Sequence, residues 1–206
     1  MLRCLKTLLG SVIHATDGEI GHVRDFLFDD SCWTIRYLVL DPGGWLSNRH
    51  VLISPFAAGQ PDWNTQVVPV SLTLEQIRHA PDVDTARPVS RQEEIAMSHH
   101  FGWPAYWALD PQSGAELVAE KEVAEERDPY LRSVTEVLSY QVRTVDGDLG
   151  TLEDLVMEDA NWFLRFIVAR TGHVLSAQKV MISTQYVQTI DWASRLITLS
   201  RSPAQM

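Results

Sequence analysis

The sequence predicts a mainly β protein built from two small β-barrels in tandem, with a short helix after the first barrel and a helical or irregular middle segment. Three observations support this fold class: an internal repeat, a series of short apolar runs separated by turn signals, and two helix-start signals between the copies. The predicted domains are 1–80 for the first barrel, 81–129 for a helical and acidic linker, and 130–206 for a second, divergent barrel.

The repeat is visible as a direct alignment within the chain. The stretch "TDGEIGHVRDFLFDDSCWTIRYLVLDPGGWLSNRHVLIS" aligns without a gap to "VDGDLGTLEDLVMEDANWFLRFIVARTGHVLSAQKVMIS". The offset is constant at 129 positions, so that Asp17 corresponds to Asp146 and Trp33 corresponds to Trp162. A repeat of this length indicates a tandem duplication.

Each copy has the pattern of a β meander. Short runs rich in Val, Ile, Leu and aromatic residues are separated by Asp-Gly, Pro-Gly-Gly or Thr-Gly turns, which is typical of a small barrel or sandwich. The predicted strands are 7–14, 19–28, 33–40, 50–54 and 66–70 in the first copy, and 136–144, 148–157, 162–169, 179–183 and 195–199 in the second.

Two capping-box patterns predict helices between the copies. Thr73 is followed three residues later by Gln76, and Ser90 is followed three residues later by Glu93. Gly102 provides a stop for the second of these helices. Beyond it the chain is acidic, and we expect a partly ordered linker with a helical piece near 116–126.

Composition and charge exclude several classes of protein. The formal net charge of −10 and the pI near 5.1 oppose binding to nucleic acid, which depends on clustered Lys and Arg. No apolar run approaches the roughly 20 residues of a membrane span, and no signal peptide is recognisable. We therefore expect a cytoplasmic protein. Cys4 and Cys32 lack the spacing of a metal site or a disulfide framework.

The acidic residues around the first turn predict hairpin ion pairs. Pairing 19–28 with 33–40 around a four-residue loop places Asp25 opposite Arg36. The same register in the second copy places Asp154 opposite Arg165. Unlike charges that face each other on an antiparallel ladder stabilise it, so these residues are predicted to be structural ion pairs.

The same register predicts strands that are apolar on both faces. One face is expected to form the core and carries Phe26, Phe28, Trp33, Ile35 and Tyr37. The other face carries Val23, Leu27, Leu38 and Leu40. This second apolar face implies a packing partner, which could be the other barrel, the middle helix or another subunit.

Catalytic and cofactor motifs are absent from the sequence. It contains no phosphate loop, no G-x-S-x-G elbow, no H-E-x-x-H pair and no dinucleotide fingerprint. The acids of "TDGEIGHVRDFLFDD" do not have the spacing of a calcium loop. We therefore expect no catalytic residue, no cofactor and no metal ligand.

Aromatic and histidine residues outside the repeat are the candidate interaction surface. They are Trp45, His99, His100, Trp103, Tyr106 and Trp107. The two histidines diverge by about 100° on a helix and cannot both bind one metal ion. The cluster "FGWPAYW" could bind a partner, although internal or inter-domain packing is the favoured interpretation. Trp45 at a glycine-rich turn would serve recognition if exposed and would plug the barrel if buried.

The repeated unit resembles a known family. The stretch "DGEIGHVRDFLFDDSCWTIRYLVLDPGGWLSNRHVLIS" is similar to the PRC-barrel family, found in the cytoplasmic part of the photosynthetic reaction centre H subunit and at the end of the bacterial ribosome-maturation factor. The similarity covers 10–75 and, more weakly, 138–200. The stretch "RPVSRQEEIAMSHHFGWPAYW" is similar to the region after the barrel in stand-alone bacterial members. The resemblance implies a barrel that acts through protein contacts and offers no catalytic residues.

Two functions are consistent with these features. The leading expectation is a non-enzymatic interaction or assembly module with a protein partner, and a homodimer is one form that it could take. The alternative is a sensor of a small ligand or metal that uses the cleft between the barrels, near the histidines and the tryptophan cluster.

Overall fold

The computed structural model describes residues 1–46, 49–81, 83, 89–106, 131–172 and 178–202. In the first copy and the segment after it, the elements are β1 Leu2–Cys4, η1 Leu5–Leu8, β2 Val12–Ala15, β3 Gly18–Asp29, β4 Thr34–Asp41, η2 Gly43–Leu46, β5 Val51–Ile53, β6 Val67–Pro69, α1 Leu74–Arg78 and α2 Arg91–Phe101. In the second copy they are β7 Leu131–Ser133, α3 Val134–Val137, β8 Gln141–Thr144, β9 Gly147–Glu158, β10 Phe163–Thr171, β11 Gln178–Ser183, η5 Thr184–Tyr186, β12 Val187–Asp191 and β13 Leu196–Leu199.

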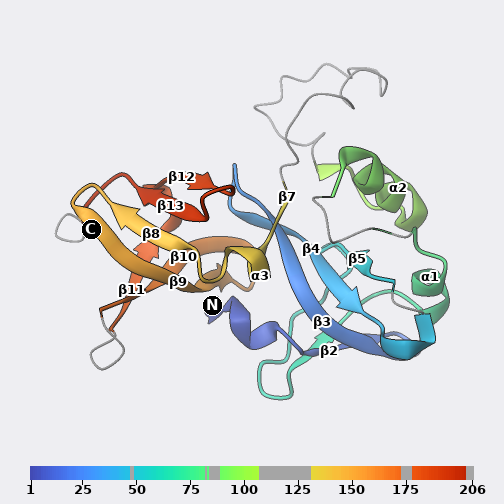
Figure 1. Ribbon diagram of the computed structural model, residues 1–206. Helices are drawn as coiled ribbons and strands as arrows, with labels where there is room; N and C mark the ends of the chain where they lie inside the picture. Colours follow the sequence, from blue (N-terminus) through green and yellow to red (C-terminus); the bar gives the residue numbers. More distant parts are fainter. Residues whose placement is uncertain (47–48, 82, 84–88, 107–130, 173–177, 203–206) are drawn as a thin grey trace.

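The protein is mainly β, as the sequence predicts, and its strands form one continuous sheet system. The order along the main path is β12-β13-β8-β9-β10-β4-β3-β2-β6 (Figure 1). Strands of the second copy lie at one end of this path and strands of the first copy at the other. The two copies meet where β10 pairs with β4.

Corresponding strands pair in the same way in the two copies. The antiparallel pairs β2–β3, β3–β4 and β4–β5 recur as β8–β9, β9–β10 and β10–β11. The parallel pair β2–β6 recurs as β8–β13. The described residues therefore repeat in three dimensions the internal similarity that the sequence shows.

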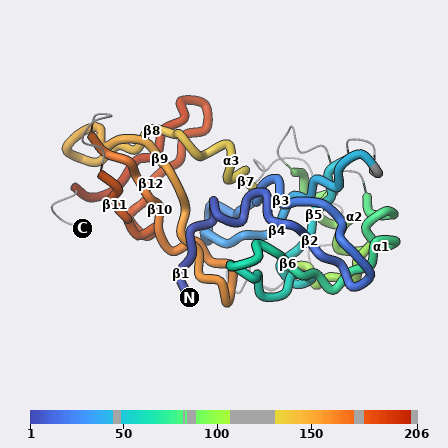
Figure 2. Tube along the Cα trace, turned by 90° about the horizontal axis from the view of Figure 1, so that it is seen from below, coloured from blue at the N-terminus to red at the C-terminus, as the bar shows by residue number. Residues whose placement is uncertain are grey.

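The N-terminal strand of each copy pairs with the other copy. Strand β1 of the first copy pairs with β9 of the second copy, where Arg3 lies opposite Met157. Strand β7 of the second copy pairs with β3 of the first copy, where Arg132 lies opposite Phe28. Figure 2 shows β1 beside the second copy and β7 beside the first. The interface between the copies is thus reciprocal, like that of a two-fold symmetric dimer.

The sequence did not predict three short strands, nor the two helical turns η1 and α3. The predicted strand 7–14 begins as the 3-10 helix η1, and the predicted strand 136–144 begins with the end of α3. The strands β1, β7 and β12 were missed. A three-residue strand such as β1 or β7 has no apolar alternation, and its partner lies more than 100 residues away in the chain.

The predicted hairpin register is wrong for two reasons: the loop begins one residue later than predicted, so that Asp29 pairs with Thr34, and each long hairpin contains β-bulges. In the first copy, Phe28 pairs with Ile35 while Leu27 pairs with Tyr37, which leaves Arg36 as the extra residue of a bulge. A one-residue shift moves every later side chain to the opposite face. Leu38 therefore faces the core together with Ile35, whereas Tyr37 faces outward.

The predicted helices between the copies are confirmed in the described residues. Both have the capping boxes that their sequences indicate, at Thr73 with Gln76 and at Ser90 with Glu93. Helix α2 ends at Gly102, which has a left-handed conformation with φ of 69°. The predicted helical piece near 116–126 lies outside the described residues.

The core is shared by both copies, and no described helix could cross a membrane. Buried side chains such as Phe26, Phe28, Leu155 and Met157 belong to one apolar cluster. Among the described residues, none of the helices combines enough length with enough apolar character to span a bilayer.

Candidate functional site

The candidate functional site is the side of each three-stranded unit that is opposite to Phe28 in the first copy and to Met157 in the second. We call these sides the outer face of the first copy (Leu27, Thr34, Tyr37, Val39 and Leu52) and the outer face of the second copy (Val156, Phe163, Phe166, Val168 and Met181). Each residue of the second list lies 129 positions after its counterpart in the first.

The two outer faces differ in exposure. Leu52 is 0% exposed, whereas its counterpart Met181 is 57% exposed. Thr34 is 7% exposed, whereas its counterpart Phe163 is 36% exposed. Tyr37 and Val39 are buried, but Phe166 and Val168 are only partly buried. Only Leu27 and Val156 are equally buried, at 6% exposure each. The outer face of the first copy is therefore covered, whereas that of the second copy is open around Phe163 and Met181.

Helix α2 and the residues after it cover the outer face of the first copy (Figure 1). The hydroxyl of Tyr106 donates to Oε1 of Glu94 at 2.5 Å. The hydroxyl of Tyr37, on β4, is bonded to the same carboxylate. Arg36 lies over the ring of Tyr106, with its guanidinium carbon 3.9 Å from the ring centroid. These contacts fix the covering segment to β4.

The Glu94 carboxylate is the buried charge of this contact. Its side chain is 4% exposed, and Arg91 lies 2.8 Å away. Burial raises the pKa of Glu94 from its ordinary value of 4.5, although Arg91 and the hydroxyls of Tyr106 and Tyr37 act in the opposite direction. Burial therefore makes the ionisation of Glu94 costly, and Arg91 and the two tyrosine hydroxyls offset part of this cost.

This raised pKa predicts a pH-dependent contribution to stability. A folded-state pKa above the unfolded value favours folding at low pH, and this contribution is lost as the pH rises through the folded-state pKa. The free energy of unfolding of the wild type should therefore fall relative to that of Glu94→Gln between pH 4 and pH 8. Each unit of pKa difference corresponds to about 1.4 kcal/mol.

Urea unfolding at a series of pH values measures this difference. Glu19→Gln is the matched control, because Glu19 is exposed on β3. A constant difference between the wild type and Glu94→Gln over the whole pH range would contradict the assignment.

The predicted ion pairs Asp25–Arg36 and Asp154–Arg165 have the wrong acidic partner. Arg36 lies 3.2 Å from Asp29, and Arg165 lies 2.6 Å from Glu158. The later start of the loop and the bulge at Arg36 together change the register, so that Asp25 lies opposite Val39 instead. The corrected pairs still repeat, because Glu158 is the counterpart of Asp29.

Asp25 and Asp154 hold the N-terminal turn of the other copy. Asp25 accepts the backbone N–H of Thr135 at 2.9 Å, at the start of α3. In the reverse direction, Asp154 accepts the backbone N–H of Lys6 at 3.1 Å, in η1. A carboxylate that accepts the first N–H groups of a helical turn satisfies donors that have no partner within the turn.

A second reciprocal pair joins the copies through arginine and tryptophan. Arg132 lies 3.3 Å from Asp30 and stacks over Trp192 at 4.3 Å from the ring centroid. The counterpart Arg3 lies 3.7 Å from Asp159 and stacks over Trp63 at 5.0 Å. Sequence reasoning did not find these contacts, although all six residues recur at the same offset.

The candidate aromatic and histidine surface is only partly described. Trp45 lies in η2, but its side chain is outside the described part, and so is Trp107 altogether. His99 and His100 are exposed, and Nε2 of His100 lies 3.0 Å from the carbonyl oxygen of Gln76.

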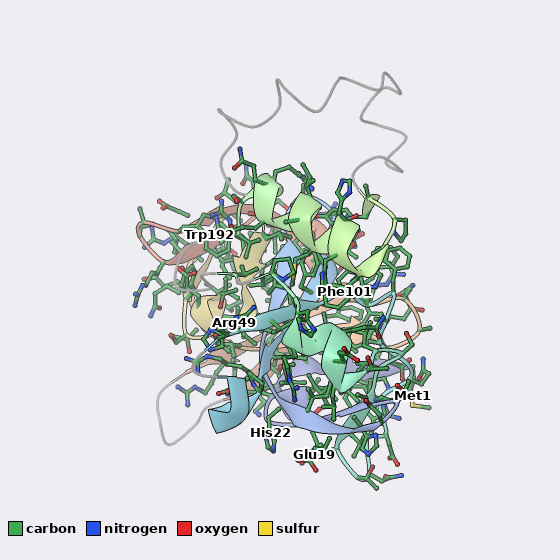
Figure 3. All side chains as sticks on the ribbon, turned by 90° about the vertical axis from the view of Figure 1, so that its right-hand side faces the viewer. Met1, Glu19, His22, Arg49, Phe101 and Trp192 are labelled. Carbon is green, nitrogen blue, oxygen red and sulfur yellow. The ribbon has the colours of Figure 1, made fainter. Side chains whose placement is uncertain are left out.

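The described aromatic residues after α2 pack within the molecule. Trp103 stacks on Phe101 at 4.3 Å between centroids, and Tyr106 covers Arg36 as described above. In Figure 3, Phe101 lies where α2 approaches α1, while His22 and Glu19 lie at the other side of the first copy. Internal packing, the favoured interpretation, is consistent with these contacts.

A shallow pocket lies at the junction of the copies. Its volume is about 250 Å³, and it is lined by Lys6 from η1 together with Leu138, Ser139, Thr151, Leu152, Glu153 and Arg170. Neither a histidine nor a tryptophan lines it, which differs from the expected cleft. The described residues also contain no group of three or more His, Cys, Asp or Glu side chains placed to hold a metal ion.

Comparison with known proteins identifies the first repeated unit. Residues 10–57 match the family model described as the PRC-barrel domain. The chain contains a PRC-barrel domain. This PRC-barrel domain includes β2 to β5 and therefore the residues of the covered outer face, whereas α1 and α2 lie after the matched residues.

One relative matches a longer segment of the chain than the PRC-barrel model does. An uncharacterized protein of Deinococcus radiodurans is 37% identical over 71 residues. The matched segment covers 34% of this chain and 25% of the relative, so that the chain accounts for about a quarter of that protein's length.

Proposed function

We propose that this PRC-barrel protein is a non-enzymatic interaction or assembly module. We also propose that 130–206 forms a second barrel of the same type. The outer face of the second copy is then the surface that contacts the protein partner. The observation that carries the proposal is the unequal exposure of equivalent faces. Exposed apolar side chains that lie together on one sheet face are typical of protein contact sites. A cytoplasmic location is part of the proposal.

The reciprocal interface supports a module rather than an enzyme. Each copy pairs one strand with the other copy and holds a helical turn of the other copy through an aspartate, and α2 already covers one of the two outer faces. In the described residues, the buried polar cluster at Glu94 is occupied by its own arginine and tyrosines. No nucleophile and base with an orienting partner are recognisable in the sequence.

Site-specific photo-crosslinking tests this proposal. A photoreactive residue is placed at Met181, and the control is placed at Phe56 of the first copy, which is 59% exposed against 57% for Met181. In a lysate of the source organism, we expect a discrete adduct with an identifiable protein from position 181. Excess unlabelled protein should compete for this adduct, whereas unlabelled Met181→Lys should not.

Two results would contradict the proposed contact surface. One is the absence of any adduct at position 181 under conditions in which the probe crosslinks to free peptide. The other is the same set of adducts at Phe56 and Met181, because matched exposure alone would then explain them.

A further inference from the structure

We propose that the outer face of the second copy binds an acidic amphipathic helix of a partner protein, and that an aromatic side chain of this partner stacks on Arg165. This inference rests on the proposed function and specifies the occupant of the same face. Because the chain contains an equivalent face that is already covered, the structure itself shows what kind of segment fits.

The covering segment of the first copy is the template for the occupant. It consists of the 11-residue helix α2, the left-handed Gly102 and a following segment that brings Tyr106 onto Arg36. Met97 of this helix is 0% exposed. The buried residues of α2 are Glu94 and Met97, so that a helix side with one acid and one apolar residue, followed by an aromatic ring, covers the outer face of the first copy.

The second copy retains the arginine that receives the aromatic ring. Arg165 is held by Glu158 as Arg36 is held by Asp29, through a bulge at the same position of the hairpin. The Arg165 side chain is 48% exposed, against 23% for Arg36. The guanidinium carbon of Arg165 lies 5.1 Å from the ring centroid of Phe163 on the same strand, whereas that of Arg36 lies 3.9 Å from the ring of Tyr106. An aromatic ring of the partner would add to the looser contact at Arg165 or replace it.

Differences between the two faces define the chemistry of the partner. Tyr37 is replaced by Phe166, which removes the hydroxyl that Glu94 binds, so that the partner helix needs no buried acid at that position. Leu52 is replaced by Met181, a flexible side chain that adapts to different apolar partners.

Charge favours an acidic partner. The whole chain has a net charge of −10, whereas the span 131–202, with eight Asp or Glu and seven Lys or Arg, is close to neutral, so that the exposed basic side chains decide the local charge. Around the open face the basic side chains project further into solvent than their partners. Lys179 is 67% exposed and its partner Glu153 is 26% exposed, while Arg165 is 48% exposed and Glu158 is 34% exposed. This arrangement attracts acidic residues that flank the apolar side of a helix.

Helix α2 of a second copy is a weaker candidate for the occupant. In each molecule, Glu94 and Met97 of this helix are already buried against the first copy. A second molecule would have to release α2 from its own outer face in order to supply it.

Binding of designed peptides to the full chain tests the inference. The probe is a fluorescein-labelled peptide with the sequence of residues 89–106 and the change Glu94→Leu, "VSRQELIAMSHHFGWPAY", because Phe166 offers no hydroxyl to a buried acid at that position. An acidic version carries Glu at the positions of Gln92 and Ser98, and a basic version carries Lys there. Fluorescence anisotropy should show that the acidic version binds more tightly than the basic one. Removing the ring at the position of Tyr106 should weaken binding about fivefold.

Variants of the protein locate the binding site. Met181→Lys should abolish binding, Arg165→Ala should weaken it about fivefold, and Arg165→Lys should restore only part of the loss, since lysine keeps the charge without the planar stacking group. Phe56→Lys is the exposed control and should bind as the wild type does. Unchanged far-ultraviolet circular dichroism confirms that the variants are folded.

Three outcomes would overturn the inference. Peptide binding that Met181→Lys and Arg165→Ala leave unchanged would place the site elsewhere. Self-association in light scattering that Met181→Lys abolishes would identify a second copy as the occupant. Crosslinking of a protein partner at position 181, together with no binding of any peptide, would leave the proposed function intact but exclude a helix of this kind.

Discussion

Replacing Gly150 with alanine is expected to lower the free energy of unfolding by more than about 3 kcal/mol. Gly150 has φ of +153°, and a Cβ atom there would lie 2.0 Å from the carbonyl oxygen of Arg170. Neither the backbone conformation nor the space admits a side chain. The counterpart Gly21 has φ of +145°, and a Cβ atom would lie 2.2 Å from the carbonyl oxygen of Asp41. Gly21→Ala should therefore have an effect of the same size.

Urea unfolding followed by circular dichroism and tryptophan fluorescence measures these effects. Gly44→Ala is the control, because no atom lies within 4 Å of a Cβ built at Gly44. Since each copy holds a strand of the other, either glycine variant should shift one common transition. Separate transitions for the two copies, or a loss below about 1 kcal/mol in both variants, would contradict the described packing.

Replacing Asp25 with alanine is expected to destabilise the protein by about 2–3 kcal/mol. Its carboxylate accepts hydrogen bonds from the backbone N–H of Phe26, the hydroxyl of Ser133, and both the backbone N–H and the hydroxyl of Thr135. Three of these four bonds come from the other copy. The variant therefore leaves donors at the junction between the copies without an acceptor.

Asp154, the counterpart of Asp25 in the second copy, provides an internal control. Asp154 accepts from the backbone N–H groups of Leu155 and Lys6 and from the thiol of Cys4, a weaker donor than the equivalent hydroxyl of Ser133, so that Asp154→Ala should cost about half as much. Asp25→Asn, which keeps one acceptor oxygen, should lie between the wild type and Asp25→Ala. Equal stability of Asp25→Ala and the wild type in urea would contradict this role of Asp25.

The repeat made most of the strand framework predictable from the sequence. Turns at Asp17 and Asp146 and apolar runs of similar length gave the positions of the long hairpins, and the capping boxes at Thr73 and Ser90 gave both helices. These signals are local, because turn geometry and capping depend on residues that are close in the chain.

The contacts that hold the copies together were not predictable in the same way. The bulge at Arg36 adds one residue to one strand and therefore changes the partner of every charge beyond it. The strands β1 and β7 each consist of three residues without an apolar pattern, and they are stabilised by a partner strand in the other copy. Such long-range pairing leaves no periodic signal.

The covering of one face by α2 also depends on residues outside the repeat. The sequence indicated an apolar face in both copies but could not show which face was covered. Tyr106 and Glu94 have no counterpart in the described part of the second copy, and their contacts with Arg36 and Tyr37 make the difference. Function is therefore expected where the two copies differ, since their shared contacts account for the fold.

Cysteine labelling at two equivalent positions tests this central claim most directly. In a background with Cys4→Ser and Cys32→Ser, either Leu52→Cys or Met181→Cys is introduced, and the rate of maleimide modification is measured in the purified, folded protein. The covered first face and the open second face predict fast modification at position 181 and strong protection at position 52. Protection at both positions, or fast modification at both, would contradict the claim that only the second copy presents an open outer face.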